Sequence, residues 1–511
     1  MSRRFRRLAL WSAAPFVLIA ALFAAGVLWP LPEAEPVVTD HPVAFVGVAV
    51  VDIERGVTVP GQTVVVDGGR IAAVGAEGAV ALPPGTERVD ARGLFVMPAL
   101  WDMHTHVYAV SPLLELPLYV AYGVTNVRDM LSCPQPGDPF ISCPADKRRW
   151  TEEAERGLRV GPRIVSTASF MANGPSMRAR LPDAPAFVGA ATAEEARQFV
   201  RHWAAQGVDE IKVYDRVPRE AYFALADEAG RLGLAVVGHR PHAVSAAEVA
   251  EAGQKSVEHA RVFLHEAFPG SDSLRAAAGT EAWREDRRRM VAEHDTARAE
   301  ALFAAFAAHG TWYVPTHLTR WSDAYADAPA VREDSLLAYL HPLMRWQWME
   351  DVDATVAADP SPEARQAYRD FYRKGLEVTG AAHRAGVGVL VGTDYVVAGA
   401  DVHRELGHLA QAGLSPADVL RAATLGPARY AGLEADFGTV EAGKVADLLL
   451  TDADPLRDVR HARRIQAVVM GGNVYDRAAL DGLQALVRRR ARSWPVACKI
   501  LWRFVRNPAR Y

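Results

Sequence analysis

One alternation runs through most of this 511-residue chain and limits the folds that it can adopt. After Met97-Pro98, short apolar runs rich in β-branched residues alternate with alanine-rich stretches of helical period, such as 193–206 and 219–232. This alternation is typical of βα units. Eight candidate strands occur, at 96–103, 124–128, 163–167, 210–214, 235–238, 256–258, 312–316 and 388–392. Because a closed (β/α)8 barrel needs eight strands, we predict an α/β fold with a TIM barrel at its centre.

Two β-rich segments flank the predicted barrel, residues 43–98 and the stretch after 433. Neither has enough strands to bury a face alone, so we expect both to pair in one small composite β-sandwich domain. Residues 264–310 and 318–384 exceed ordinary βα loops and should be helical inserts that shape the substrate pocket. The predicted parts are an anchor or signal segment (1–30), the first part of the β domain (31–97), the barrel (98–432), the second part of the β domain (433–480) and a basic amphipathic tail (481–511).

The N-terminal segment predicts where the protein resides. Leu8 to Trp29 is an uncharged, mostly apolar run of 22 residues that follows four arginines. Its length favours an uncleaved membrane anchor over a cleaved signal peptide. The positive-inside rule then places the rest of the chain on the periplasmic or extracellular side. If the segment is cleaved instead, the protein is free in the periplasm.

The C-terminal tail and the overall charge predict the partners. Residues 486–511 carry eight Lys or Arg and no acid, interleaved with aromatic and aliphatic side chains. This tail could lie on an anionic membrane or pack on the folded body as a helix with a solvated basic face. The formal net charge of −4 offers no general attraction to nucleic acid. A homo-oligomer is compatible with the sequence.

Two of the three cysteines flank a proline-rich loop. In an oxidising compartment, Cys133 and Cys143 should form a disulfide that closes this loop. The alternative is a pair of unpaired small residues. Cys498 has no partner in either case.

Histidines and an aspartate follow the ends of several predicted strands. His104 and His106 end the first barrel strand, and the alternation of side chains along a strand puts both imidazoles on one face. His239, His259 and Asp394 each follow another apolar run. A His-x-His triplet alone is a weak signal, but the carboxyl ends of barrel strands are where such folds place their sites. The pattern predicts a metal site at that rim.

A lysine lies inside an apolar strand. Lys212 stands in Ile211-Lys212-Val213-Tyr214, whose neighbours demand burial, and a buried ammonium without a partner is costly. The pKa of this lysine should fall, and the neutral amine can add carbon dioxide to give a carbamate that bridges two divalent metals. The alternative is a lysine paired with a neighbouring carboxylate.

Taken together, these motifs make the sequence resemble the amidohydrolase superfamily, in its imidazolonepropionase-like and prolidase-like branch. The resemblance covers roughly residues 43–480 and rests on PALWDMHTH (98–106), GVTNVRDM (123–130), IKVY (211–214), GH (238–239), SVEH (256–259), GTD (392–394) and GTVEAGKVADLL (438–449). It implies a binuclear site with His104, His106 and Asp394 on one metal, His239 and His259 on the other, and carboxylated Lys212 between them. It also implies that Arg128 and Asp129 support the site from behind the ligands.

This site predicts hydrolysis of a small molecule at a carbon–nitrogen bond, in an amide, peptide or N-acyl compound, as in a dipeptidase or prolidase. Two divalent ions, best matched by Zn²⁺, would hold a bridging hydroxide that attacks the carbonyl, with Asp394 as the catalytic proton shuttle. One alternative is the same site acting as an esterase, lactonase or phosphotriesterase. Another is a non-catalytic, membrane-anchored binding protein on the same scaffold.

Four further residues are candidates for substrate contact. Arg240 and His242 directly follow a predicted ligand and could meet a substrate carboxylate, or else only solvate their loop. Tyr214 and His317 stand at the ends of predicted strands, where a structural role is as reasonable as a substrate contact.

Overall fold

The computed structural model describes residues 3–174 and 189–507, with side chains described from residue 15 onward. Its centre holds two parallel sheets that contain seven of the eight predicted barrel strands. One sheet has the order β6-β7-β8 and the other β12-β11-β10-β9. The strands are β6 (Leu100–Thr105), β7 (Val124–Asp129), β8 (Arg163–Thr167), β9 (Glu210–Val213), β10 (Ala235–Gly238), β11 (Ser256–Glu258) and β12 (Trp312–Val314). The α/β expectation is therefore confirmed.

The sheet topology of the described chain does not confirm the predicted closed barrel. The expected eighth strand, 388–392, contributes only an isolated bridge, between Tyr313 and Val389, and the two sheets meet at isolated bridges such as Ala168 to Glu210. Two glycines explain the close, irregular course of this segment. A Cβ on Gly388 would lie 2.6 Å from the Trp312 ring, and one on Gly392 would lie 2.5 Å from the Val314 side chain.

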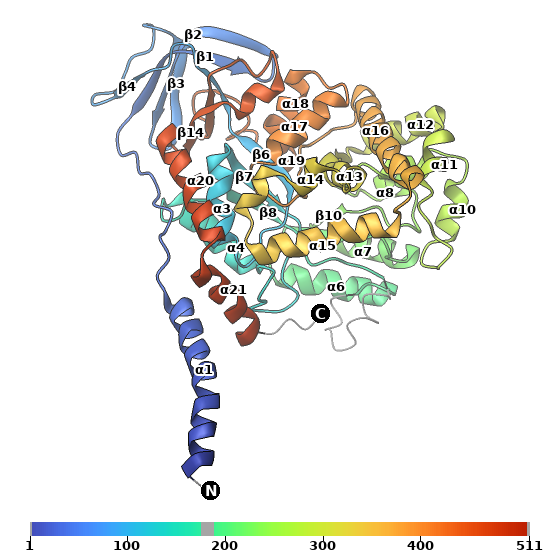
Figure 1. The fold of residues 1–511 in the computed structure, drawn as a ribbon. Coiled ribbons are helices and arrows are strands. Elements are labelled where there is room, and N and C mark those ends of the chain that lie inside the picture. The colour runs from blue at the N-terminus through green and yellow to red at the C-terminus, as the bar shows by residue number, and fades with distance from the viewer. Residues whose placement is uncertain (1–2, 175–188, 508–511) are drawn as a thin grey trace.

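Segments before and after the parallel sheets share a single eight-stranded sheet (Figure 1). Its order is β15-β14-β13-β5-β1-β2-β3, and β4 pairs with β1. The strands are β1 (Val43–Asp52), β2 (Val57–Asp67), β3 (Arg70–Ala76), β4 (Glu87–Asp90), β5 (Phe95–Pro98), β13 (Leu448–Thr451), β14 (Ile465–Met470) and β15 (Asn473–Asp476). Strand β13 runs antiparallel to β5, with Leu449 opposite Met97, and joins the two segments. The domain boundaries given above stay predictions.

Helices cover the parallel sheets and fill the two long segments between strands. The first such segment forms α9 to α12 and the second α13 to α16, as expected for helical inserts. The helices are α1 (Arg3–Leu28), α2 (Ser111–Leu114), α3 (Leu116–Ala121), α4 (Pro144–Glu155), α6 (Ala193–Ala205), α7 (Arg219–Arg231), α8 (Ala246–Glu251), α9 (Val262–Glu266), α10 (Ser271–Ala276), α11 (Arg287–Ala292), α12 (Thr296–His309), α13 (His317–Ala324), α14 (Pro329–Arg332), η2 (Ser335–Tyr339), α15 (Pro342–Ala358), α16 (Pro362–Arg384), α17 (Val402–Gln411), α18 (Pro416–Ala423), α19 (Leu425–Ala431), η3 (Val459–Arg463), α20 (Arg477–Ala491) and α21 (Trp494–Arg506).

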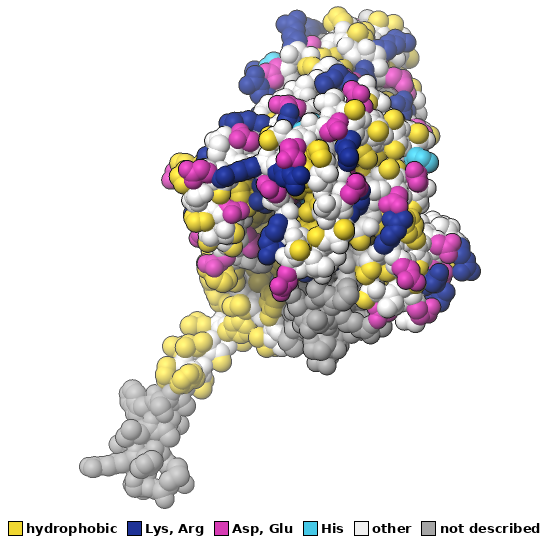
Figure 2. Space-filling view, turned by 90° about the vertical axis from the view of Figure 1, so that its right-hand side faces the viewer, with side chains coloured by type: hydrophobic (Ala, Val, Ile, Leu, Met, Phe, Trp, Pro, Cys, Tyr) yellow, Lys and Arg dark blue, Asp and Glu magenta, His cyan; other side chains and the backbone are white. Residues whose placement is uncertain are grey.

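The N-terminal helix α1 projects from the body beside the C-terminal helix α21 (Figure 1). The ring centroids of Trp29 and Trp494 lie 6.4 Å apart, and Lys499 Nζ donates to the Val27 carbonyl oxygen at 2.5 Å. Buried Val496 and Ile500 attach α21 to the body. Of the two arrangements considered for the C-terminal tail, this is the one in which the tail packs on the folded body as a helix. Apolar side chains cover the described part of α1 and continue onto the base of the body (Figure 2).

A membrane span was expected at Leu8 to Trp29. Within the part of the chain whose side chains are described, no helix has the length and apolar character that crossing a membrane requires. Residues 8–14 of the expected anchor lie outside that part. Export and the location of the protein stay predictions.

Candidate metal and catalytic site

The predicted ligands gather where the parallel strands end. His104 and His106 lie at the end of β6, while His239 and His259 directly follow β10 and β11. The Asp394 amide donates to the His104 carbonyl oxygen at 2.8 Å, which attaches the irregular 388–394 segment to β6. Parallel strands thus bring together side chains that are far apart in the sequence.

Short distances connect these five side chains in one cluster. The Asp394 carboxylate lies 3.0 Å from His106 Nε2 and 3.7 Å from His104 Nε2. The Nε2 atoms of His239 and His259 are 2.9 Å apart. One ligand atom each from His104, His259 and Asp394 falls within a mutual distance of 4.8 Å, so these three residues could hold a metal ion.

Three of the four histidines are oriented from behind by an oxygen. In each of them Nδ1 contacts the oxygen, which leaves Nε2 for the cluster: His104 with Glu258 Oε2 at 3.0 Å, His239 with Asp215 Oδ1 at 2.8 Å, and His259 with Thr316 Oγ1 at 2.8 Å. Such partners fix the ring and the tautomer of metal-ligating histidines.

The inward-facing nitrogens fit a divalent cation. His104 Nε2 is buried and has no hydrogen-bond partner among the described residues. Burial lowers the pKa of both His239 and His259, so the two rings are neutral at physiological pH. When Nδ1 carries the proton, each Nε2 presents a lone pair, and two lone pairs 2.9 Å apart need a cation between or beside them.

Lys212 lies in β9 beside this cluster and is only 2% exposed. Burial lowers the pKa of its ammonium, although the negative charges of Asp394 and Glu258 act in the opposite direction. Besides burial, the positive charge of Lys212 in turn lowers the pKa of His106 and of His239. A lowered pKa increases the fraction of neutral amine.

A buried arginine holds the network behind the ligands. Arg128 donates to Glu210 Oε2 at 2.8 Å, to Glu258 Oε1 at 3.2 Å and to the Met103 carbonyl oxygen at 3.0 Å. Although burial raises the pKa of Glu258, Arg128 and His104 bring it down to about 2. Arg128 therefore keeps Glu258 ionised, and Glu258 in turn orients His104.

Asp129 is also buried behind the site. Its carboxylate accepts a hydrogen bond from the Val107 amide at 2.6 Å and pairs with the buried Lys147. These contacts hold the chain directly after His106. They are the kind of contacts that the resemblance implies for Arg128 and Asp129.

Backbone strain concentrates at this site. Among the described residues other than glycine, only His259, Thr316 and Asp394 have positive φ angles, of 74°, 44° and 44°. Such conformations cost roughly 1–3 kcal/mol each and persist where the surrounding structure imposes them.

Of the four candidates for substrate contact, Tyr214 lies closest to the cluster. Its ring stacks on His239 with centroids 4.0 Å apart. Arg240 is buried, pairs with Glu266 at 3.2 Å and donates to the Val244 carbonyl oxygen at 2.7 Å, so its contacts are those of a structural residue.

The other two candidates are packed within the protein. His242 stacks on Trp283 at 3.9 Å between centroids, and burial lowers its pKa to about 3. His317 is fully buried at the start of α13. Substrate contact by any of the four candidates stays a prediction.

Cys133 and Cys143 form a disulfide in the structure, and Cys498 is free. The loop that the disulfide closes carries Phe140, which lines a cavity next to the cluster.

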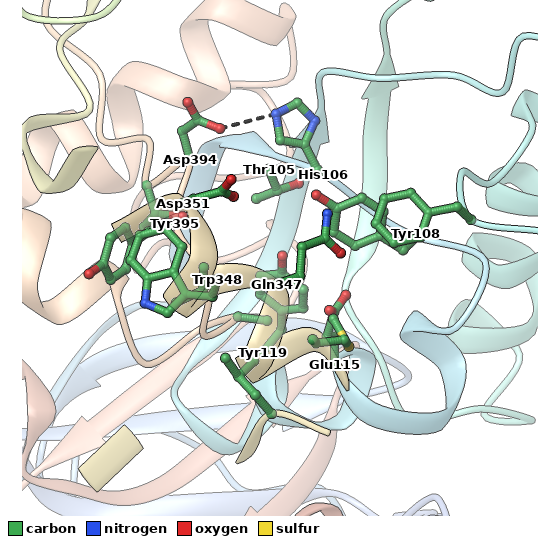
Figure 3. A pocket seen from close by; sticks show the side chains of 16 residues that line it. Thr105, His106, Tyr108, Glu115, Tyr119, Gln347, Trp348, Asp351, Asp394 and Tyr395 are labelled. Carbon is green, nitrogen blue, oxygen red and sulfur yellow. Dashed lines mark ion pairs between the residues drawn. The ribbon is translucent and has the colours of Figure 1, made fainter. Parts of the chain in front are cut away.

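This cavity, of about 170 Å³, opens beside His106 and Asp394 (Figure 3). Helix α15 of the second insert contributes Met344, Gln347, Trp348 and Asp351 to its wall. These positions follow the three- and four-residue spacing of one helix face. The cavity wall therefore includes a long insert, as expected.

Sequence reasoning missed three acids behind the ligands. Glu258 stands inside the SVEH motif, and Asp215 follows the IKVY strand by one position. Asp102 accepts hydrogen bonds from the amides of His104 and Thr393, at 3.2 Å and 2.9 Å, and so ties β6 to the Asp394 loop. The signal in each case was an acid within or next to a strand that carries a ligand.

Comparison with known proteins identifies the class. The profile of the amidohydrolase family matches residues 95–475, so the chain belongs to this family, and it is a hydrolase of carbon–nitrogen bonds. No curated protein matches the chain.

Solved structures share the fold. Bottromycin amidohydrolase is 24% identical, with a TM-score of 0.65 over 88% of this chain and 90% of its own. A Xaa-Pro dipeptidase with bound methionine is 17% identical, with a TM-score of 0.58 over 85% of this chain and 100% of its own. The ochratoxinase of A. niger is 17% identical, with a TM-score of 0.56 over 85% and 96%.

Proposed function

We propose that this chain hydrolyses an amide, peptide or N-acyl bond of a small molecule with the help of two divalent metal ions, best matched by Zn²⁺. The carrying observation is the cluster of four imidazoles and Asp394, in which three rings are oriented through Nδ1 by oxygens behind them. The nitrogen and oxygen ligand atoms of His104, His259 and Asp394 lie close enough together to hold one ion, and such ligands suit zinc. The solved structures with a similar fold include an amidohydrolase and a dipeptidase.

Each metal would have its own set of ligands. His104, His106 and Asp394 would hold one ion, and His239 and His259 the other. Lys212, as a carbamate formed with carbon dioxide, would lie between the two ions. Its burial and the lowered pKa of its ammonium support this role.

Bound ions would lower the pKa of a water molecule and polarise the substrate carbonyl. Asp394 would take the proton of the attacking water and deliver it to the leaving nitrogen. Although burial raises the pKa of this carboxyl, the neighbouring histidines hold it well below its usual range, so Asp394 is ionised and can accept a proton. Asp394 and His259 both have positive φ angles, a strained conformation that persists where the surrounding structure imposes it.

The parallel strands and segment 388–394 would form the (β/α)8 barrel of this family. Hydrogen bonds support this arrangement, because the Met103 amide donates to Val391 and the Tyr313 amide to Gly388. The irregular segment thereby lies between β6 and β12.

The test uses the purified full chain, stripped with a chelator and reloaded with zinc and bicarbonate. We expect about two metals per chain and turnover of dipeptides or N-acyl amino acids. Lys212→Ala should lose most of the metal and nearly all turnover. Asp394→Asn should keep part of the metal, with kcat about 10²–10⁴-fold lower. The control is Lys374→Ala, on α16 outside the cluster.

Elemental analysis and turnover are measured on the same samples. A wild-type chain with neither metal nor turnover would reject the proposed function. Full metal occupancy and rate in Lys212→Ala would reject only the carbamate, and an unchanged kcat in Asp394→Asn would remove its role in proton transfer.

A further inference from the structure

The cavity beside the metal cluster has an uneven charge. His106 and Asp394 lie at one end of it, and two further acids, Glu115 and Asp351, line its wall (Figure 3). No lysine or arginine is among the described residues that line it. The cavity therefore disfavours an anionic group away from the metal end.

Glu115 is buried without a counter-charge. It lies between α2 and α3, is 8% exposed, and makes no ion pair with any residue in the described ranges. The Ser111 hydroxyl donates to it. Burial raises the pKa of Glu115 to about 7. A buried carboxylate of this kind is stabilised by a cation that enters the cavity.

Asp351 reaches the same cavity from a different element. It lies on the face of α15 that also carries Gln347 and Trp348, and it has no ion-pair partner in the part of the chain that is described. Many other surface acids here are paired, as Asp353 on the same helix is with Arg332 at 2.7 Å. The acid that faces the cavity is therefore left open to a ligand.

Aromatic rings line the cavity near these acids. Trp348 and Tyr395 meet edge to face, with centroids 5.1 Å apart, and Tyr108 and Phe140 lie 4.7 Å apart. Aromatic faces attract ammonium and guanidinium groups, by about 0.5–2 kcal/mol. Carboxylates and aromatic rings together are a binding surface for a cation on an apolar stem.

We propose that this cavity binds a positively charged group of the substrate, an ammonium or guanidinium on a short apolar stem, between Glu115 and Asp351. The proposal rests on the proposed function and assigns its substrate class: amides or peptides with a basic group next to the scissile bond. The negative wall binds the cation away from the metal ions, and this orients the carbonyl toward them.

The experiment compares matched dipeptides on the zinc-loaded full chain. The probes are Lys-Ala, Met-Ala and Glu-Ala, with the reversed set Ala-Lys, Ala-Met and Ala-Glu, because either side of the bond could enter the cavity. In one set, we expect kcat/KM for the lysine compound to exceed that for methionine by about ten-fold, with glutamate lowest. Glu115→Gln and Asp351→Asn should each reduce this preference about three-fold or more, through KM.

Glu350→Gln is the matched control, because Glu350 is exposed on α15 next to Asp351 but does not line the cavity. It should leave the preference unchanged. Equal rates for lysine, methionine and glutamate compounds would overturn the cation site and leave the hydrolase function intact.

If no dipeptide turns over, calorimetry separates the two proposals. N-acetyl-lysine amide should then bind more tightly than N-acetyl-norleucine amide, and Glu115→Gln should remove the difference. Equal or absent binding of the two amides would overturn the cation site as well.

Discussion

The strand ends that carry the histidines proposed to bind metal and the insert helix α15 border the same cavity, yet they are built in opposite ways. At the strand ends, His104, Glu258 and Arg128 are buried to 2% exposure or less. Helix α15 has 17 residues, of which only Val352 is buried. One side of the cavity is held by a buried polar network, and the other by a helix that is mostly open to solvent.

This difference separates chemistry from selectivity. A catalytic cluster needs positions fixed within fractions of an ångström, which buried partners supply. A helix with little buried surface can change its cavity-facing residues at small cost in stability. Substitutions at the strand ends should therefore alter metal content and kcat, whereas those on α15 should alter mainly KM and substrate preference.

The largest expected effect is on the pH dependence of stability, at the point where the insert that carries α15 begins after strand β12. Glu405 of α17 accepts the amides of His317 and Leu318, at 2.8 Å and 3.0 Å, and so holds the start of the insert that follows β12. Burial raises the pKa of Glu405 to about 8, from an ordinary value of 4.5. The contribution of protonated Glu405 to the free energy of unfolding is complete below pH 4.5 and is lost as the pH rises through about 8. The reason is that Glu405 loses its proton at a lower pH in the unfolded chain than in the folded chain.

Glu405→Gln stays neutral throughout this range. Between pH 5 and pH 8 the wild type should lose about 2–3 kcal/mol more than this variant, as measured by urea unfolding. The buried carboxyls Asp102, Glu115 and Asp401, which also have raised pKa values, cancel in the difference. An equal loss in both proteins would show that Glu405 is ionised in the fold, and the junction would then be no weaker at high pH.

The gathering of the proposed metal ligands could be predicted from the sequence because these residues end apolar strands. His239 and His259 each follow a short run whose neighbours must be buried, and parallel strands place such ends side by side. The sequence also predicted a closed barrel, which the sheet topology of the described chain does not confirm, because segment 388–392 forms only an isolated bridge and its glycines pack closely against Trp312 and Val314.

The wall of the cavity was only partly predictable. The long segment 318–384 indicated an insert near the site, but an exposed helix gives a weak apolar period, and α15 buries only Val352. Nothing in the local sequence therefore distinguishes Trp348, which lines the cavity, from the exposed Trp346. The pairing of Asp215 with His239 likewise depends on a contact across two strand ends, which spacing alone does not show.

A smaller effect tests the rigid side alone. Asp215 lies 2.8 Å from His239 Nδ1 and also pairs with Arg261 at 3.0 Å. Asp215→Asn removes the charge that fixes the tautomer of His239, so zinc affinity should fall about 10–100-fold, with turnover restored by excess zinc. Competition with a zinc chelator measures the affinity.

The control for this variant is Asp436→Asn, which breaks an exposed pair with Arg70 in another part of the chain. It should leave zinc affinity unchanged. If Asp215→Asn binds zinc as tightly as the wild type, the partners behind the ligands do not set the chemistry, and the contrast with α15 loses its basis.

The smallest effect is expected on α15, where two tryptophans lie two positions apart on different faces. Trp348 lines the cavity and packs against Tyr395, whereas Trp346 is 63% exposed. Trp348→Ala should lower kcat/KM about 3–10-fold, mainly through KM, because it removes an aromatic wall and leaves the metal ligands in place. Trp346→Ala should stay within about two-fold, since surface substitutions remove few contacts. Steady-state kinetics and zinc content are measured for both variants. If Trp348→Ala loses zinc, or if its kcat falls as much as its kcat/KM, then α15 supports the catalytic cluster itself. The two sides of the cavity would then be one rigid unit.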